Sequence, residues 1–172
     1  MEPTRKQVFE NLIRAMCGGG QRIIFREAAM SRSTVLSVEP PPEDFGAVIG
    51  RQASHYRALE VLYLAAVDKQ DGKTATLSVV TPDTRTEQRR TFRRDPTFTK
   101  EKLKALVRQV AEQVFDGGTI EVNDAIRDTF LVELTASGEH NPEIEESLKV
   151  VFNAVGKAHG VDVWLDLVQL SA

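Results

Sequence analysis

The chain has little cysteine, few aromatic residues and no long apolar run, and each shortage excludes a class of protein. Cys17 is the only cysteine among 172 residues, which excludes an internal disulfide and a cysteine-rich zinc site. Aromatic residues make up 6% of the chain, with one Trp and two Tyr. No run approaches the roughly 18 apolar residues of a membrane-spanning helix, and the charged start lacks the apolar segment of a signal peptide. We therefore expect a cytoplasmic protein without a membrane partner.

What the chain does contain is typical of a globular protein with an uneven charge. Hydrophobic residues make up 41% and charged residues 27%. Residues 1–110 hold 19 basic and 13 acidic side chains, a net charge of +6, whereas residues 111–172 hold 3 and 12, a net charge of −9. Either the two parts bind different partners or the split is accidental.

Apolar spacing and helix-ending residues predict an α+β fold in which one order of elements occurs twice. The first part is expected to contain a helix from residue 5 to 16, strands at 21–27 and 33–38, a short helix after 42, a longer helix from 54, and a strand at 74–80. The second part is expected to contain a helix at 100–115, strands at 119–122 and 128–134, a helix after 141, and a strand at 161–168. The alternative is one continuous α+β domain without a repeat.

This order predicts two tandem units joined by a linker. The first unit spans residues 1–82, an arginine-rich linker spans 83–98, and an acidic second unit spans 99–172. Each unit is expected to pack its helices on a three-stranded sheet.

The most informative segment is the predicted turn between the short and the long helix of the first unit. Gly50 lacks the Cβ that would keep a phosphate away. The next helix begins near Ser54, so its free backbone N–H groups face the space over the turn. Arg51 adds a positive charge, and Gln52 adds an amide that can donate or accept. This combination favours a site for a sugar-phosphate backbone.

The stretch DFGAVIGRQA at residues 44–53 resembles the motif of a KH domain of the bacterial type, D-x-G-x-x-I-G-[KR]-x-G. The resemblance covers about residues 5–82 and is closest to small single-KH RNA-binding proteins. It implies a type II KH fold, in which a turn of this kind clamps single-stranded nucleic acid. By position, Gly50, Arg51 and Gln52 form the clamp and Ile49 forms the floor of the base groove. The resemblance extends to Arg57 in the long helix.

Ala53 departs from the motif because it replaces the second clamp glycine. If this position needs a positive φ, alanine is strained there. If it already belongs to the first turn of the helix, alanine favours the helix. In both cases the added Cβ could crowd a phosphate.

An arginine cluster in the linker adds basic charge. Nine basic and three acidic residues lie between Arg85 and Arg108, and the linker residues expected to contact RNA are Arg89, Arg90, Arg93 and Arg94. Phe92 and Phe98 are placed to stack on bases. Equally, these arginines could only solubilise a linker or pair with the acidic second unit.

The second unit resembles the first without its clamp, so we expect protein contact or a homodimer there instead of RNA. Trp164 lies opposite the main apolar row of its strand, which indicates either an interface residue or packing under a helix. Catalytic residues, metal ligands and cofactors are not expected, because the three histidines have no ligand spacing. The sequence thus predicts a non-catalytic protein that binds single-stranded RNA through residues 49–54, Arg57 and the linker. The alternative is a protein-interaction or scaffold module that kept the fold and lost RNA binding.

Overall fold

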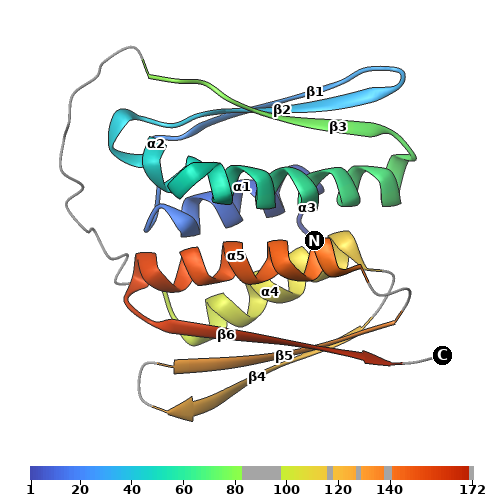
Figure 1. Cartoon of the computed structure of the whole chain (residues 1–172). Helices are drawn as coiled ribbons and strands as arrows, with labels where there is room; N and C mark the ends of the chain where they lie inside the picture. Colours follow the sequence, from blue (N-terminus) through green and yellow to red (C-terminus); the bar gives the residue numbers. More distant parts are fainter. Residues whose placement is uncertain (83–97, 116–117, 127–128, 138–140, 171–172) are drawn as a thin grey trace.

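The chain folds into four layers, in the order sheet, helices, helices, sheet (Figure 1). The computed structural model describes residues 1–82, 98–115, 118–126, 129–137 and 141–170. The first half contains α1 (Arg5–Met16), β1 (Ile24–Ala29), β2 (Ser33–Glu39), α2 (Pro42–Ile49), a 3₁₀ turn η1 (Arg51–Ala53), α3 (Ser54–Asp71) and β3 (Thr74–Val79). The second half contains α4 (Lys100–Val114), β4 (Gly118–Ile126), β5 (Thr129–Ser137), α5 (Pro142–His159) and β6 (Asp162–Leu170).

The two halves repeat the same strand pairing, so the predicted α+β class and order of elements are confirmed. In the first sheet the central strand β2 is antiparallel to β1 and parallel to β3. In the second sheet the central strand β5 is antiparallel to β4 and parallel to β6. Each half therefore runs helix–strand–strand–helix–strand, with α2 and η1 added only in the first.

The helices form two inner layers that pack against each other. Figure 1 shows α1 and α3 against the first sheet, and α4 and α5 against the second. Buried apolar side chains from both halves form one continuous core, whose largest members include Phe9, Tyr63, Leu103 and Phe152. The two halves are thus joined by burial of apolar surface. The predicted linker lies outside the described residues except for Phe98.

Local signals explain where the helices begin. Thr4 accepts a hydrogen bond from the backbone N–H of Gln7, and the Gln7 side chain accepts one from the backbone N–H of Thr4, which together form a capping box. The Asn141 side chain accepts from the backbone N–H groups of Glu143 and Ile144 at the start of α5. Because these caps use only nearby residues, the sequence alone predicts them.

Strand limits differ more from the predictions. The first strand begins at Ile24, three residues later than expected, and β4 covers nine residues where only 119–122 were predicted. Apart from a register shift near its end, β4 pairs along its length with β5. Tertiary pairing therefore extended a strand whose own apolar pattern is short.

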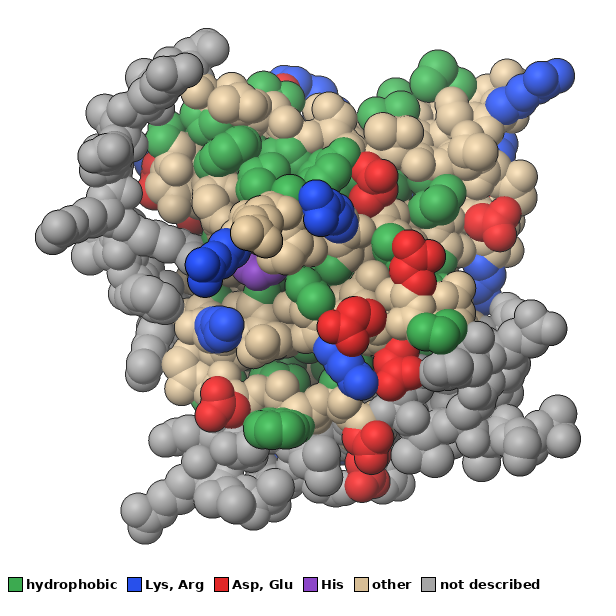
Figure 2. Space-filling model, in the orientation of Figure 1, with side chains coloured by type: hydrophobic (Ala, Val, Ile, Leu, Met, Phe, Trp, Pro, Cys, Tyr) green, Lys and Arg blue, Asp and Glu red, His purple; other side chains and the backbone are tan. Residues whose placement is uncertain are grey.

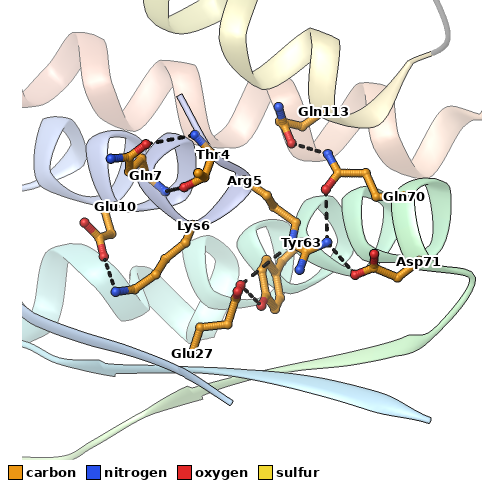
Figure 3. A network of polar contacts seen from close by, with 10 residues as sticks. All are labelled: Thr4, Arg5, Lys6, Gln7, Glu10, Glu27, Tyr63, Gln70, Asp71 and Gln113. Carbon is orange, nitrogen blue, oxygen red and sulfur yellow. Dashed lines mark hydrogen bonds and ion pairs between the residues drawn. The ribbon is translucent and has the colours of Figure 1, made fainter. Parts of the chain in front are cut away.

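A polar network ties α1, β1 and α3 together (Figure 3). The hydroxyl of the fully buried Tyr63 donates a hydrogen bond to the Glu27 carboxylate at 2.7 Å. Burial together with this hydrogen bond raises the pKa of Tyr63 above its ordinary value. Arg5 lies 3.7 Å from the same carboxylate and donates to Asp71 at 2.8 Å. Gln70 accepts from Arg5 and donates to Gln113 of α4, so the network reaches the second half.

Among the helices that the structure describes, none has the length and apolar character needed to cross a bilayer.

Candidate nucleic-acid interface

The candidate site is the turn that joins α2 to α3. Pro42 occupies the first turn of α2, where a backbone N–H would have no hydrogen-bond partner within the helix. Glu43 and Asp44 in the same turn stabilise the helix by interaction with its dipole. Arg22 contacts Glu43 at 2.8 Å. The helix ends at Gly50, and α3 begins four residues later at Ser54. The sequence predicted this helix–glycine–helix arrangement correctly.

The backbone of the turn is unusual at three positions. Gly50 has φ 73° and ψ 171°, a conformation that is essentially limited to glycine. Gln52 and Ala53 both have a left-handed conformation, with φ of 53° and 60°. The turn is closed by hydrogen bonds from the backbone N–H of Ala53 to the carbonyl of Gly50 and from that of Ser54 to the carbonyl of Arg51.

His55 holds the turn in this shape. A Cβ added at Gly50 would lie 2.5 Å from the His55 ring. The Nδ1 of His55 lies 2.6 Å from the carbonyl oxygen of Ala47, which can only accept, so Nδ1 carries a proton and donates. His55 therefore connects the first turn of α3 to α2. This role of His55 is not predictable from the sequence, because a lone histidine five residues after a glycine has no recognisable spacing.

This packing corrects one expectation about Gly50. The absence of a side chain there does not leave room for a phosphate, since the position that a Cβ would occupy is filled by His55. Glycine is needed instead for the backbone conformation and for the histidine ring. A ligand must then approach the turn from the side of its exposed residues.

The exposed residues are those expected to bind a phosphate. Arg51, Gln52 and Arg57 are exposed, whereas Ala53 and Ser54 are half-buried. Ile49, the predicted floor of a base groove, is also half-buried at the end of α2. Figure 2 shows Lys and Arg side chains and a histidine over the helical layers on the left, and further Lys and Arg side chains at the upper right and at the lower centre. Asp and Glu side chains lie mostly to the right and below.

Tyr56 anchors the start of α3 to the first sheet. Its hydroxyl oxygen lies 2.7 Å from the Glu60 carboxylate and 2.8 Å from the carbonyl oxygen of Leu77 in β3. The hydrogen bond to Glu60, with partial burial, raises the pKa of Tyr56 to about 12. The start of α3 is therefore held against the first sheet.

The sequence left two conformations open for Ala53, a strained one with positive φ and a helical one. The structure has the strained one, with φ of 60°. A left-handed conformation costs an L-residue about 1–2 kcal/mol, and Ala53 has no side-chain polar group to offset this. Alanine at this position therefore weakens the turn instead of favouring the helix.

Replacing Ala53 by glycine should raise the free energy of unfolding by about 0.5–1 kcal/mol, because relief of strain exceeds the added flexibility of the unfolded chain. Urea denaturation measures this difference. The matched control is Ala65→Gly inside α3, which should lower the same quantity by about 1 kcal/mol. A loss of stability in Ala53→Gly would contradict the strained geometry.

The linker part of the predicted site falls in a segment that the structure does not describe. The linker residues Arg89, Arg90, Arg93 and Arg94 lie outside the described residues, as does Phe92. Trp164 is 66% exposed, in agreement with its predicted outward position. Across the described parts of the chain, no three His, Cys, Asp or Glu side chains are grouped to hold a metal ion.

No protein-family model matches the chain, and no curated protein is significantly similar to it.

Proposed function

We propose that the chain is a non-catalytic protein that binds single-stranded RNA, or unpaired segments of RNA, at the α2–α3 turn. The observation that carries the proposal is the turn itself, which presents Arg51, Gln52 and Arg57 to solvent from a backbone held by Gly50 and His55. Arginine side chains bind phosphate with several parallel donors. The proposed contact is with the sugar-phosphate backbone, which carries no sequence information by itself.

The fold supports this proposal. The order α1–β1–β2–α2–α3–β3 is the helix–strand–strand–helix–helix–strand order that the resemblance to type II KH domains implies. The turn lies between the two helices, where that resemblance places the clamp. We infer a first unit related to KH domains and a second unit, without α2, that has lost the clamp.

The strain at Ala53 bears on affinity. A half-buried methyl group stands where the motif has glycine, next to the exposed Arg51 and Gln52. Binding through this turn should therefore be modest, with much of it contributed by charge and weakened by salt.

The test is fluorescence anisotropy with short labelled RNAs, on wild type and on Arg51→Gln/Arg57→Gln. Loss of two phosphate contacts should weaken binding at least tenfold and reduce the slope of log K against log salt by about 1.4. The control Lys149→Gln/Lys157→Gln removes the same charge from α5 and should bind like wild type. Circular dichroism establishes that each variant is folded.

Equal loss of binding in both double variants would mean that net charge, not the turn, sets the affinity. Unchanged binding in Arg51→Gln/Arg57→Gln would remove the turn from the site. In either case the proposed interface would be wrong.

The exposed Trp164 favours a second candidate function, contact with a protein. It lies between Asp162 and Asp166, which are also exposed on the outer face of β6. Glu133 is next to Asp166 in the strand register. A second copy of the chain or a basic protein segment would suit this surface. Because Trp164 is the single tryptophan, its emission as protein concentration rises distinguishes a self-associating surface from a monomeric one.

A further inference from the structure

A cavity lies where the two halves of the chain meet, apart from the α2–α3 turn. Its volume is about 310 Å³, within the range of small-molecule sites. It is lined by residues of α1 and α4, by Phe98 just before α4, and by His159 at the end of α5. In Figure 1, α1 and α4 lie behind α3 and α5.

The side chains that line the cavity favour an anion. Arg14, Lys102 and His159 are of the basic types, and the described residues that line the cavity include no carboxylate. Arg14 pairs with the carboxylate of Glu10 on the same helix at 3.5 Å, the outer limit of a hydrogen bond. Its guanidinium lies 4.9 Å from the centre of the Phe25 ring, a contact that orients it without using its N–H donors.

One wall of the cavity is planar and held in place. The rings of Phe98 and His159 stack at 3.8 Å with an angle of 13° between them. The Nε2 of His159 lies 3.0 Å from the carbonyl oxygen of Ala15, so this nitrogen donates to α1. The wall therefore exists before any ligand binds, which lowers the entropic cost of binding.

Two carboxamides are also among the described residues that line the cavity. Asn11 on α1 and Gln109 on α4 each offer both donors and acceptors. Such groups match the edge of a nucleobase, while the aromatic wall matches its face. An inorganic anion would use only the basic residues and would leave the planar wall and the carboxamides without a role.

We propose that this cavity binds a mononucleotide, with its phosphate at Arg14 and Lys102 and its base along the Phe98 wall. A free nucleotide and the terminal nucleotide of an RNA strand share this chemistry. The cavity shares no described lining residue with the α2–α3 turn, so nucleotide binding there can be tested independently of the proposed RNA clamp.

Isothermal titration calorimetry with AMP, GMP, CMP, UMP and inorganic phosphate tests the proposal on the full chain. At least one nucleotide should bind saturably, and at least tenfold more tightly than phosphate. Arg14→Gln and Lys102→Gln should each weaken that binding about tenfold. The matched control is Arg108→Gln, because Arg108 is exposed on α4, the helix of Lys102, but does not line the cavity.

Three outcomes would overturn the proposal: no saturable binding of any nucleotide, binding no tighter than that of phosphate, or equal weakening by Arg108→Gln. The variant Arg51→Gln/Arg57→Gln should bind the nucleotide like wild type, which separates this site from the clamp. Competition with RNA that carries or lacks a terminal phosphate then identifies the source. Displacement only by phosphorylated RNA assigns the site to a strand end, and no displacement assigns it to a free nucleotide.

Discussion

Replacing Gly50 by alanine should lower the free energy of unfolding by about 3 kcal/mol, from backbone strain and overpacking together. The new Cβ would lie 2.5 Å from Cγ of His55 and 2.8 Å from its backbone nitrogen. The backbone nitrogen belongs to the first turn of α3 and cannot move without displacing that helix. The φ of 73° with ψ of 171° adds strain that no rotation of a side chain relieves. Urea denaturation monitored by circular dichroism measures the change.

The same substitution four residues earlier provides the control. Gly46 is exposed in α2, and a Cβ added there would meet nothing within 4 Å. Gly46→Ala should therefore raise the free energy of unfolding by about 0.5–1 kcal/mol, the ordinary gain of alanine over glycine in a helix. Similar effects of the two substitutions would show that the turn is not held by His55 in the way described.

Replacing Glu27 by alanine should lower the free energy of unfolding by about 2–4 kcal/mol. The change leaves the fully buried hydroxyl of Tyr63 without its acceptor, a desolvation cost of about 1–3 kcal/mol, and removes one of the carboxylates near Arg5. Arg5 retains Asp71 at 2.8 Å, which limits the loss. Denaturation at neutral pH measures this effect, because the hydroxyl of Tyr63 is protonated there and can donate to Glu27.

A double-mutant cycle isolates the bond between Tyr63 and Glu27. Tyr63→Phe removes the donor and Glu27→Ala the acceptor, so the double variant has no unsatisfied hydroxyl and should be less destabilised than the sum of the single variants. Glu27→Gln keeps a carbonyl acceptor and should cost less than Glu27→Ala. Strict additivity of the two single effects would mean that the two side chains do not interact.

The order of elements could be predicted because it depends on local signals. The helix that starts at Thr4 is specified by a capping box, and the helix after Asn141 by an N-cap followed by proline. Strand limits were less predictable, since β4 extends beyond its apolar residues by pairing with β5. Pairing partners lie far along the chain, so no local pattern contains that information.

The candidate site was predictable in its residues but not in its geometry. Gly50, Arg51, Gln52 and Arg57 are placed by the structure in and beside one exposed turn, as their sequence suggested. The role of His55 was not predictable, because it depends on the distance between the first turn of α3 and the carbonyl of Ala47. The sequence suggested that glycine at position 50 gives a ligand access to the backbone. In the structure, glycine at this position leaves space for the His55 ring.

By itself the sequence determined the α+β class, the repeated order of helices and strands, the helix caps and the position of the glycine turn. Each follows from the spacing of apolar residues or from groups within a few positions of one another. The strain at Ala53, the Tyr63–Glu27–Arg5 network and the cavity between α1 and α4 depend instead on how the folded chain packs. These features arise where residues distant in sequence pack together, and the backbone conformations and burial that result depend on the whole fold.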